Sequence, residues 1–547
     1  MPLELAVFIF FIVTFPFLLA IDHFRTRRKL RIRLEKAFGK SPSGSYRLTG
    51  LDSYWRTFAR HKAHWPVDDI TWADLDMDEI FDRIDACQSS LGSGWLYAAL
   101  RTPLSPEQLQ QREQLLALWE EQPALRLNIQ MLLAQLGKRP GADLPHLLAQ
   151  PQAYQLSTPW KYPFCAALPW VCLLALPFAP QTAGSLLLAS LILNGVLYLQ
   201  AQKQLDTRLA TFGYLLRAVS CGKKTASALQ KVRPDLARQL RQAAAAGKKL
   251  GGGPLLAGAA SSDAFSQLLG VLTLLPVIQY CRSVGRLESL RPQLLELFDL
   301  LGELDGSIAL CSFRRSLPLW CRPTFWEEPG LDAQGLGHPL LDDPVRSDAR
   351  VDGCWLLTGS NASGKSTFLR AVAINCILAQ TIHTCTASRF SLAPGAVASS
   401  MAVRDDVTGG ESYFVAEIRS LGRLVKMAGT LPLYCFIDEI LKGTNTAERI
   451  AASQAVLGYL ARKGALCMAA THDLELVELA GSAYQNHHFC ETITENGVEF
   501  DYTLKDGPCR TRNALRLLEY YHFPDEILQS AWQMAKDAGS PPPSSPC

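Results

Sequence analysis

One stretch of the sequence has the residue types and spacing of a phosphate-binding loop. Gly359 and the Gly-Lys-Ser-Thr segment 364–367 fit the pattern G-x-x-x-x-G-K-[ST]. Loops of this kind point several backbone N–H groups at phosphate oxygens, and the helix that follows adds positive potential. Lys365 is then expected to reach the β- and γ-phosphates, and the Ser366 hydroxyl to bind Mg²⁺. The expected nucleotide-binding residues are Gly359, Ser360, Asn361, Ala362, Ser363, Gly364, Lys365, Ser366 and Thr367.

The segments on either side of this loop have the patterns that a phosphate loop requires. Residues 354–358 form an apolar run typical of a buried strand, and residues 368–380 have the pattern of a helix. A strand that leads through a glycine-rich turn into a helix gathers backbone amides around one phosphate group. The context therefore favours a working phosphate loop over a chance match.

Two apolar segments further along the chain end in side chains suited to hydrolysis. Residues 433–437 lead into Asp438 and Glu439, and residues 466–470 lead into a Thr-His pair that contains His472. At a strand end, Asp438 is expected to hold the Mg²⁺ shell and Glu439 to polarise the attacking water. His472 can sense or stabilise the γ-phosphate. The order and separation of these features predict an α/β P-loop ATPase of the ABC type, with ATP and Mg²⁺ as cofactors.

The residues around these positions resemble the ATPase domain of MutS proteins. The resemblance is carried by residues 358–361, 364–370, 379–380, 409–414, 417, 438–440, 442–446 and 470–472. Upstream, residues 75–76, 85, 92, 100–104 and 112–113 resemble the start of the MutS core domain, and residues 338–341 resemble the motif before its phosphate loop. The resemblance implies that Ser366 and Asp438 bind Mg²⁺, that Glu439 is the general base and that His472 is a switch histidine.

The same resemblance implies a homodimer. Ser412 matches the signature serine of the family, which reaches across a dimer interface to the γ-phosphate held by the other subunit. Ser412 is therefore expected to act in trans. A physical argument agrees, because the γ-phosphate of a lone P-loop domain of this type faces solvent and a second subunit must supply the missing donors.

The chain departs from the MutS pattern at its N-terminal side. Motifs that resemble the MutS core begin near residue 70, which leaves no room for the mismatch-reading and connector domains. The Phe-x-Glu tripeptide used by that reading domain occurs at residues 325–327 and 489–491, both in the wrong part of the chain. Mismatch reading of the usual kind is therefore not expected.

Long apolar segments predict membrane helices. Residues 5–21 are followed by an arginine-rich cluster, which favours an anchor over a cleaved signal peptide and places the N-terminus outside. Residues 164–179 and 183–199 contain no charge and predict a membrane hairpin over 161–200, since a soluble helix pair would show a polar face. Three spans then place the ATPase domain of a multi-pass cell-membrane protein in the cytoplasm. The apolar run 265–281 is expected to be a buried core helix.

The expected fold is an α/β P-loop ATPase domain of the ABC type at the C-terminus. An all-α domain with transmembrane helices, resembling the MutS core, precedes it. The expected boundaries are 1–24 for the transmembrane anchor, 25–160 for a cytoplasmic helical MutS-core-like segment, 161–200 for the transmembrane hairpin, 201–325 for a helical core and lever segment, 326–535 for the ATPase domain, and 536–547 for a disordered tail.

Two biological roles remain open at the level of the sequence. In the first, ATP hydrolysis drives a clamp on DNA whose form is unknown. In the second, a membrane-tethered conformational switch acts on a protein partner without DNA. The basic residues between 223 and 249 fit DNA phosphates or a helix face beside anionic lipid. The net charge of +3 favours neither role, and the 15 cysteines show no paired metal spacing.

Overall fold

The computed structural model describes residues 21–22, 24–42, 50–251, 272–360, 363–401, 413–441, 444–494, 497–509 and 513–537. Within these ranges the chain forms two compact units that interleave along the sequence. Unit 1 takes its residues from 1–62, 84–98 and 114–316, and unit 2 takes its residues from 63–83, 99–113 and 317–547.

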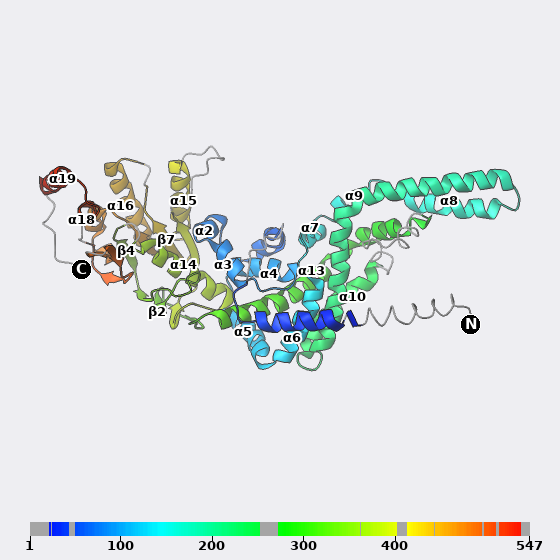
Figure 1. Ribbon diagram of the computed structural model, residues 1–547, viewed down its shortest axis with the longest axis horizontal. Helices are drawn as coiled ribbons and strands as arrows, with labels where there is room; N and C mark the ends of the chain where they lie inside the picture. The colour runs from blue at the N-terminus through cyan, green and yellow to red at the C-terminus, as the bar shows by residue number, and fades with distance from the viewer. Residues whose placement is uncertain are drawn as a thin grey trace. The chain divides into compact units, whose positions relative to one another are not determined.

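Unit 1 is helical in the part that the structure describes (Figure 1). A helix over residues 24–37 comes first. The elements that follow are η1 (Trp55–Ala59), η2 (Arg60–Lys62), most of α4 (Ser90–Arg101), part of α5 (Pro106–Glu121), α6 (Pro123–Leu136), α7 (Leu144–Ala149), η3 (Pro151–Tyr154), α8 (Lys161–Ala175), α9 (Pro180–Leu229), α10 (Pro234–Leu250) and α13 (Leu275–Ser316).

A buried carboxylate joins α13 to the start of α4. Asp305 accepts hydrogen bonds from the backbone amides of Gln88 (2.9 Å) and Ser89 (2.8 Å) and from the Ser89 hydroxyl (2.6 Å). Burial raises the pKa of Asp305 to about 6, against these hydrogen bonds, which lower it. Gly92 leaves the space that the carboxylate occupies, because a Cβ atom there would lie 2.3 Å from Asp305 Oδ2.

The helix predicted over residues 265–281 is only partly realised. Residues 265–271 lie outside the described ranges, and Leu274 leaves the helical conformation with a φ of 50°. Helix α13 begins at Leu275, and Pro276 occupies its first turn, where a missing N–H costs nothing. The prediction of one continuous helix was therefore wrong at Leu274, although Val277 and Tyr280 are buried as expected of a core helix.

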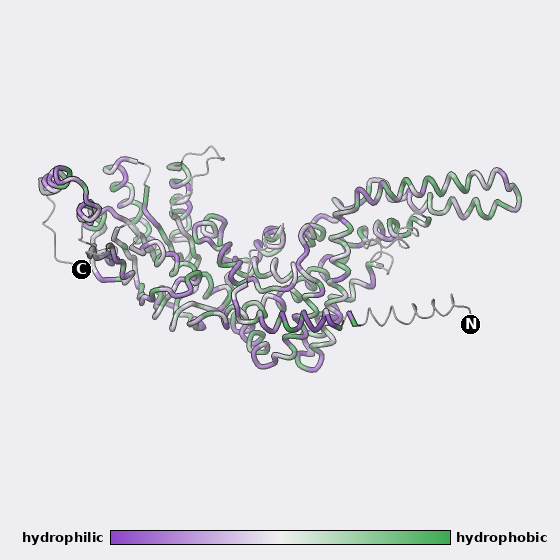
Figure 2. The backbone as a smooth tube through the Cα atoms, viewed as in Figure 1, coloured by the Kyte–Doolittle hydropathy of each residue, from purple (hydrophilic) through white to green (hydrophobic). Residues whose placement is uncertain are grey.

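Helices α8 and α9 form the hairpin that the sequence predicts over residues 161–200. The tube in Figure 2 is largely green over α8 and the first half of α9, which marks hydrophobic residues. Within the described ranges, Pro180–Leu205 is the one helix long and apolar enough to cross a membrane. Helix α8 is apolar but has only 15 residues. The predicted N-terminal anchor lies almost entirely outside the described residues.

Unit 2 contains the sheets of the described chain. Two short helices, α2 (Asp69–Asp74) and α3 (Met77–Ile84), belong to it almost entirely. A four-stranded sheet has the order β1 (Thr324–Phe325), β5 (Arg389–Leu392), β2 (Leu331–Leu336), β3 (Ser347–Val351). A six-stranded sheet has the order β12 (Lys505–Asp506), β9 (Tyr484–His488), β4 (Cys354–Thr358), β8 (Leu466–Ala470), β7 (Leu433–Asp438), β6 (Ala396–Ser400). A hairpin joins β10 (Glu491–Thr494) to β11 (Gly497–Phe500).

Helices cover the six-stranded sheet, whose strands β9, β4, β8, β7 and β6 pair in parallel. The helices of this unit are α14 (Lys365–Ile382), α15 (Tyr413–Met427), α16 (Thr446–Arg462), α17 (Leu474–Ala480), η4 (Gly481–Ala483), α18 (Asn513–Tyr520) and α19 (Asp525–Asp537). Because α19 reaches Asp537, the predicted disordered tail from 536 overlaps a helix by two residues, and 538–547 lie outside the described ranges.

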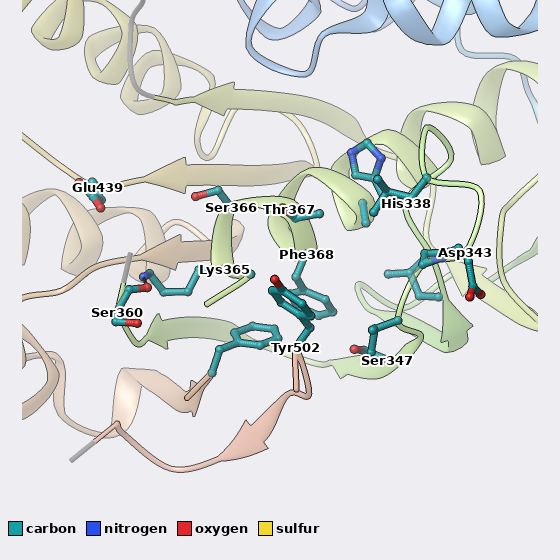
Figure 3. Close-up of a pocket in the computed structure, with 17 residues that line it drawn as sticks. His338, Asp343, Ser347, Ser360, Lys365, Ser366, Thr367, Phe368, Glu439 and Tyr502 are labelled. Atoms are coloured by element: carbon teal, nitrogen blue, oxygen red, sulfur yellow. Dashed lines mark hydrogen bonds between the residues drawn. The ribbon is translucent and has the colours of Figure 1, made fainter. Parts of the chain in front are cut away.

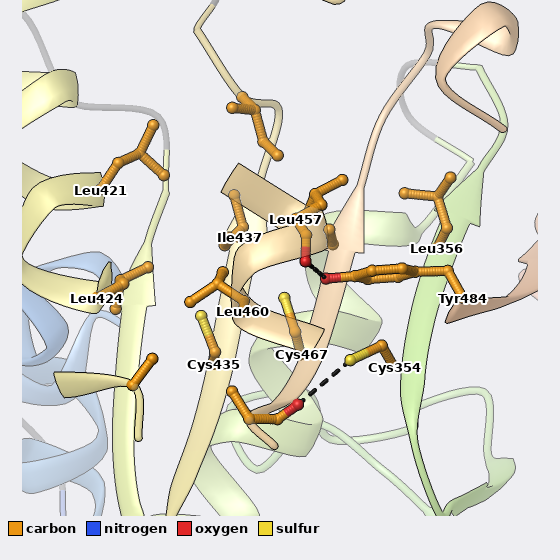
Figure 4. Packing of buried hydrophobic residues seen from close by; sticks show 14 of the residues in the cluster. Cys354, Leu356, Leu421, Leu424, Cys435, Ile437, Leu457, Leu460, Cys467 and Tyr484 are labelled. Atoms are coloured by element: carbon orange, nitrogen blue, oxygen red, sulfur yellow. Dashed lines mark hydrogen bonds between the residues drawn. The ribbon is translucent and has the colours of Figure 1, made fainter. Parts of the chain in front are cut away.

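The core between this sheet, α15 and α16 is shown in Figure 4. Side chains alternate along each strand, so that Cys354 on β4, Cys467 on β8 and Cys435 on β7 lie in one cluster. Tyr484 also enters it, and its hydroxyl donates a hydrogen bond to the carbonyl oxygen of Leu457 (3.1 Å). Strands that are buried on both faces read as continuous apolar runs, which explains why the sequence identified them.

Substitution of Gly92 by alanine tests the contact between α4 and Asp305. The added methyl group meets a carboxylate that three donors hold in place, so we expect G92A to lower the free energy of unfolding by about 1–3 kcal/mol. The matched control is Gly285→Ala in α13, where a Cβ atom meets nothing within 4 Å. That variant should gain roughly 0.5–1 kcal/mol. Equal stability of the two variants in urea denaturation would contradict this account.

Candidate functional site

Three parallel strands bring the predicted site residues to one edge of the six-stranded sheet. Strand β8 lies between β4 and β7, and Leu357, Ala470 and Asp438 are partners in one row across them. Backbone hydrogen bonds continue this pairing beyond the strand ends, from the Thr471 amide to the Leu357 carbonyl and from the Glu439 amide to the Ala470 carbonyl, both at 2.9 Å. The carboxyl edge of a parallel sheet is where α/β proteins place their ligands.

The phosphate loop leaves β4 and enters α14 through two glycines in conformations that favour glycine. Gly359 has a φ of 142°, and a Cβ atom there would lie 2.3 Å from the carbonyl oxygen of Phe489. Gly364 has a φ of 108° and is the N-cap of α14. The Lys365 ammonium donates to the carbonyl oxygens of Gly359 and Ser360, each at 2.6 Å. The lysine is thus folded over the loop that a phosphate group would occupy.

Asp438 at the end of β7 has the properties of a metal-shell carboxylate. Its Oδ1 atom is buried, and no hydrogen-bond partner for it exists among the residues that the structure describes. A buried carboxylate oxygen without a donor is costly unless a cation or water completes it. Mg²⁺ prefers oxygen ligands and is usually held by one or two protein groups plus phosphates. The carboxylate of Asp438 and the hydroxyl of Ser366, at the start of α14, therefore fit this ion.

Glu439 and His472 lie together at the ends of β7 and β8. His472 Nδ1 is 3.7 Å from Glu439 Oε1; the Glu439 side chain is 11% exposed and that of His472 is 50% exposed. Glu439 has a φ of 54°, an uncommon conformation for a residue other than glycine. Arg449 on α16 forms a bidentate salt bridge with Asp473, with N···O distances of 2.9 and 2.8 Å. This salt bridge holds the residue that follows His472.

A cavity of about 480 Å³ opens beside the loop (Figure 3). The predicted residues that line it are Ser360, Gly364, Lys365, Ser366, Thr367 and Glu439. The other lining residues were not predicted as parts of this site, and they include His338, Phe489 and Tyr502. Tyr502 packs on the loop, since a Cβ atom at Gly364 would lie 3.0 Å from the tyrosine ring. His338 stands in the motif 338–341 and Phe489 in the Phe-x-Glu tripeptide 489–491, but neither pattern indicates a place in this cavity, and Tyr502 stands in no pattern that the sequence revealed.

Two titratable residues beside the phosphate loop, His338 and Glu491, contribute to the electrostatics of the site. Burial, together with the positive charge of Arg370, lowers the pKa of His338 to about 4, so its imidazole is neutral at neutral pH. Glu491 is 5% exposed and accepts a hydrogen bond of 2.5 Å from the Ser360 hydroxyl. The burial of Phe489 and Glu491 also excludes the tripeptide 489–491 as an exposed wedge between DNA bases.

Several predicted site residues lie outside the described ranges. They are Asn361 and Ala362 of the phosphate loop and Ser412, the residue expected to act in trans. Their roles stay predictions. The described site residues lie as follows: Gly359, Ser360, Ser363, Gly364, Lys365, Ser366 and Thr367 on the loop and the first turn of α14, Asp438 and Glu439 at the end of β7, and His472 after β8.

Comparison with known proteins identifies relatives of this part of the chain. Residues 355–538 match the family model of MutS domain V. The DNA mismatch repair protein MutS of Natronomonas pharaonis is 30% identical over 243 residues, which is 42% of this chain and 28% of that protein. MutS 2 of Haloarcula marismortui is 30% identical over 273 residues, or 44% and 28%. MutS 1 of Halobacterium salinarum is 30% identical over 242 residues, or 42% and 27%.

The match to domain V covers the phosphate loop, Asp438, Glu439 and His472, whereas His338 lies before it. The chain spans between a quarter and a third of the length of these curated relatives. The match to domain V begins inside β4, directly before the phosphate loop, and continues through β7 and β8. The comparisons thus show that the part of the chain that contains the phosphate loop is similar to MutS proteins.

Proposed function

We propose that this protein hydrolyses ATP to ADP and phosphate with Mg²⁺ at the carboxyl edge of the six-stranded sheet. The observation that carries the proposal is the row formed by Leu357, Ala470 and Asp438 on three adjacent parallel strands. Through this row the phosphate loop, Glu439 and His472 lie at one edge of one sheet, which supports their proposed roles. The match to MutS domain V supports the same activity.

Binding of the nucleotide is the task of the loop and of α14. The backbone amides at the N-terminus of this 18-residue helix face the phosphates, where the helix dipole favours negative charge. On nucleotide binding, the Lys365 ammonium exchanges the carbonyl oxygens of Gly359 and Ser360 for phosphate oxygens. The positive charge that pairs with the phosphates is therefore already in the site. The base and ribose occupy the cavity between Tyr502 and His338.

Hydrolysis requires a base and compensation of the charge that develops on the γ-phosphate. Glu439 accepts the proton of the attacking water, and His472, at 3.7 Å, orients this carboxylate. Lys365 stabilises the developing negative charge. Ser366 and Asp438 would hold Mg²⁺, which would neutralise phosphate charge when bound.

Substitution of Glu439 separates binding from hydrolysis. We expect E439Q to lower kcat by roughly 100-fold or more while the Kd for ATP changes little, because the amide keeps the shape but cannot accept the proton. K365A should instead weaken ATP binding itself. Turnover by the purified protein and equilibrium binding of a fluorescent ATP analogue measure the two effects. Normal turnover by E439Q would exclude Glu439 as the base.

The composite site of a homodimer is the finer part of this proposal. Its basis is the resemblance of Ser412 to the signature serine of MutS proteins together with the match to domain V. In this arrangement Ser412 of one subunit completes the phosphate site of the other. The biological output is a DNA-bound clamp, and the alternative is a switch that acts on a protein partner. The curated relatives are named as DNA mismatch repair proteins, which favours the clamp.

Turnover in the presence of DNA distinguishes these outputs. A DNA-coupled clamp should hydrolyse ATP faster with duplex, mismatched or branched DNA, and the stimulation should weaken at higher salt because counterions are released on binding. Indifference to all three forms of DNA would favour the protein switch. Sedimentation with Mg²⁺ and a non-hydrolysable ATP analogue tests the dimer, and a monomer at every concentration would contradict the composite site.

The hairpin of α8 and α9 supports attachment to a membrane. Its large apolar side chains point outward: Phe164 is 63% exposed, Leu174 is 75% exposed and Phe178 is 89% exposed. Two polar side chains in the middle of the apolar part of α9 are turned inward, since Ser190 is 7% exposed and Asn194 is fully buried. This polarity is the reverse of that of a soluble helix pair and matches helices in lipid, where polar groups are satisfied internally.

The lengths of the two helices constrain how the hairpin meets lipid. Pro180–Leu205 has 26 residues and is about 39 Å long, enough to cross a hydrocarbon core of about 30 Å. Helix α8 has 15 residues and is about 22 Å long, which is too short to cross alone without the turn at its end. The hairpin therefore enters the bilayer from one side, with its lysine-flanked base at the surface.

Charged substitutions on the outward face test this attachment. In a chain without residues 1–24, which removes the predicted anchor, we expect the protein to stay with the membrane after an alkaline wash. Leu188→Asp combined with Ile192→Asp should release it, because both residues are more than 60% exposed on the lipid-facing side. The matched control is Val415→Asp with Ile418→Asp on α15, exposed apolar residues outside the hairpin. Release of the unsubstituted hairpin protein by the wash would refute membrane insertion.

A further inference from the structure

Two cysteines of unit 2 face each other across an antiparallel bridge. Cys321 lies between the end of α13 and β1, and Cys385 lies between the end of α14 and β5. The amide of each donates to the carbonyl oxygen of the other, at 2.9 and 3.0 Å. In such a hydrogen-bonded pair the Cα atoms are about 5.5 Å apart. This spacing falls within the range of about 4.4–6.8 Å that a disulfide requires.

The surroundings hold the two segments against each other on either side of the pair. Glu113 binds Arg322 at 2.7 Å and His383 Nδ1 at 3.2 Å, and these residues are close neighbours of the two cysteines in sequence. The rings of Phe325 and His383 stack with centroids 6.1 Å apart and planes 11° apart. The register of the cysteines is therefore fixed by contacts that do not involve sulfur.

The chemistry of the pair favours attack by Cys321. Both side chains are thiols; Cys321 is partly exposed, whereas Cys385 is fully buried. The neighbouring Cys385 side chain lowers the pKa of Cys321 although burial opposes this effect, and the Cys385 sulfur also lies 3.7 Å from the carbonyl oxygen of Asn375. A partly exposed thiolate beside a second cysteine is the arrangement of a redox-sensitive thiol pair. Among the described residues no cluster of His, Cys, Asp or Glu is placed to hold a metal ion, so the pair is not part of one.

We propose that Cys321 and Cys385 form a redox modification site, in which a hydroperoxide converts the two thiols into a disulfide. The Cys321 thiolate attacks the peroxide oxygen, the O–O bond breaks, and a sulfenic acid and an alcohol or water are formed. The Cys385 thiol then attacks the sulfenic sulfur and releases water. Two thiols are oxidised by two electrons, and one peroxide is reduced. A thiol reductant reverses the reaction by exchange.

The disulfide would enclose the phosphate loop in a covalent ring. The ring runs from residue 321 to residue 385 and contains β4, the phosphate loop and all of α14. A cross-link over such a length restricts the unfolded chain and so stabilises the fold that contains it. This inference depends on the geometry of the pair and stands independently of the proposed ATPase activity.

Peptide mapping of the oxidised full-length protein tests the proposal. The protein is treated with hydrogen peroxide, unfolded, alkylated and digested with trypsin. We expect the peptide 316–346 linked to the peptide 371–389, two hydrogen masses below their sum, and its loss after treatment with dithiothreitol. The second peptide also contains Cys376, so Cys376→Ala serves as the matched control and should still form the link. Cys321→Ser should abolish it.

The melting temperature gives a second readout. It should rise on oxidation of the natural protein and of Cys376→Ala, and it should not rise in Cys321→Ser, whose partly exposed position tolerates the exchange. Full alkylation of Cys321 and Cys385 after peroxide treatment, or a link from Cys321 to Cys376, would overturn the proposal. A linked pair without a rise in melting temperature would contradict the claim that the cross-link stabilises the fold.

Discussion

The pairing of β8 between β4 and β7 is the constraint on which the site depends. It puts Leu357, Ala470 and Asp438 in one row, so the segments that follow the three strands emerge side by side. The two backbone hydrogen bonds beyond the row carry this order into the loops, as far as Thr471 and Glu439. A shift of one residue in either strand pair would turn Asp438 away from the site.

Unit 2 and the hairpin of α8 and α9 differ in where their apolar side chains lie. In unit 2 the apolar side chains of β4, β7 and β8 are buried, and the polar groups gather at the sheet edge. In the hairpin of α8 and α9 the apolar side chains are outside, and Asn194 is inside. The same hydrophobic effect produces both arrangements if water surrounds the first and lipid surrounds the second.

Much of unit 2 could be predicted from the sequence because its strands are continuous apolar runs. The runs at residues 354–358, 433–437 and 466–470 were confirmed as β4, β7 and β8, and the predicted helix after the loop was confirmed as α14. The spacing of Gly359 and Gly364 and the carboxylates at the end of a strand, Asp438 and Glu439, are local patterns that can be recognised in the sequence. The sequence could not assign residues 63–83 and 99–113 to unit 2, because that depends on contacts between distant segments.

Features without a local signal could not be predicted. Tyr502 and Phe489 reach the cavity from the segment after β9; Tyr502 stands in no recognised pattern, and the tripeptide that contains Phe489 does not indicate a place in this cavity. The break at Leu274 was missed because an apolar run looks the same whether or not Pro276 starts a new helix within it. The cysteine pair was missed because β4, the phosphate loop and α14 lie between Cys321 and Cys385 in the sequence. The two residues become neighbours only in the folded chain.

The most direct test of the account is the binding of a non-hydrolysable ATP analogue to the purified full-length protein, measured by calorimetry with Mg²⁺ and with EDTA. A site formed by the phosphate loop, Ser366 and Asp438 predicts one nucleotide bound per chain and weaker binding when Mg²⁺ is removed. Absence of binding in both conditions, or binding that is indifferent to Mg²⁺, would contradict a magnesium-dependent nucleotide site at the carboxyl edge of this sheet.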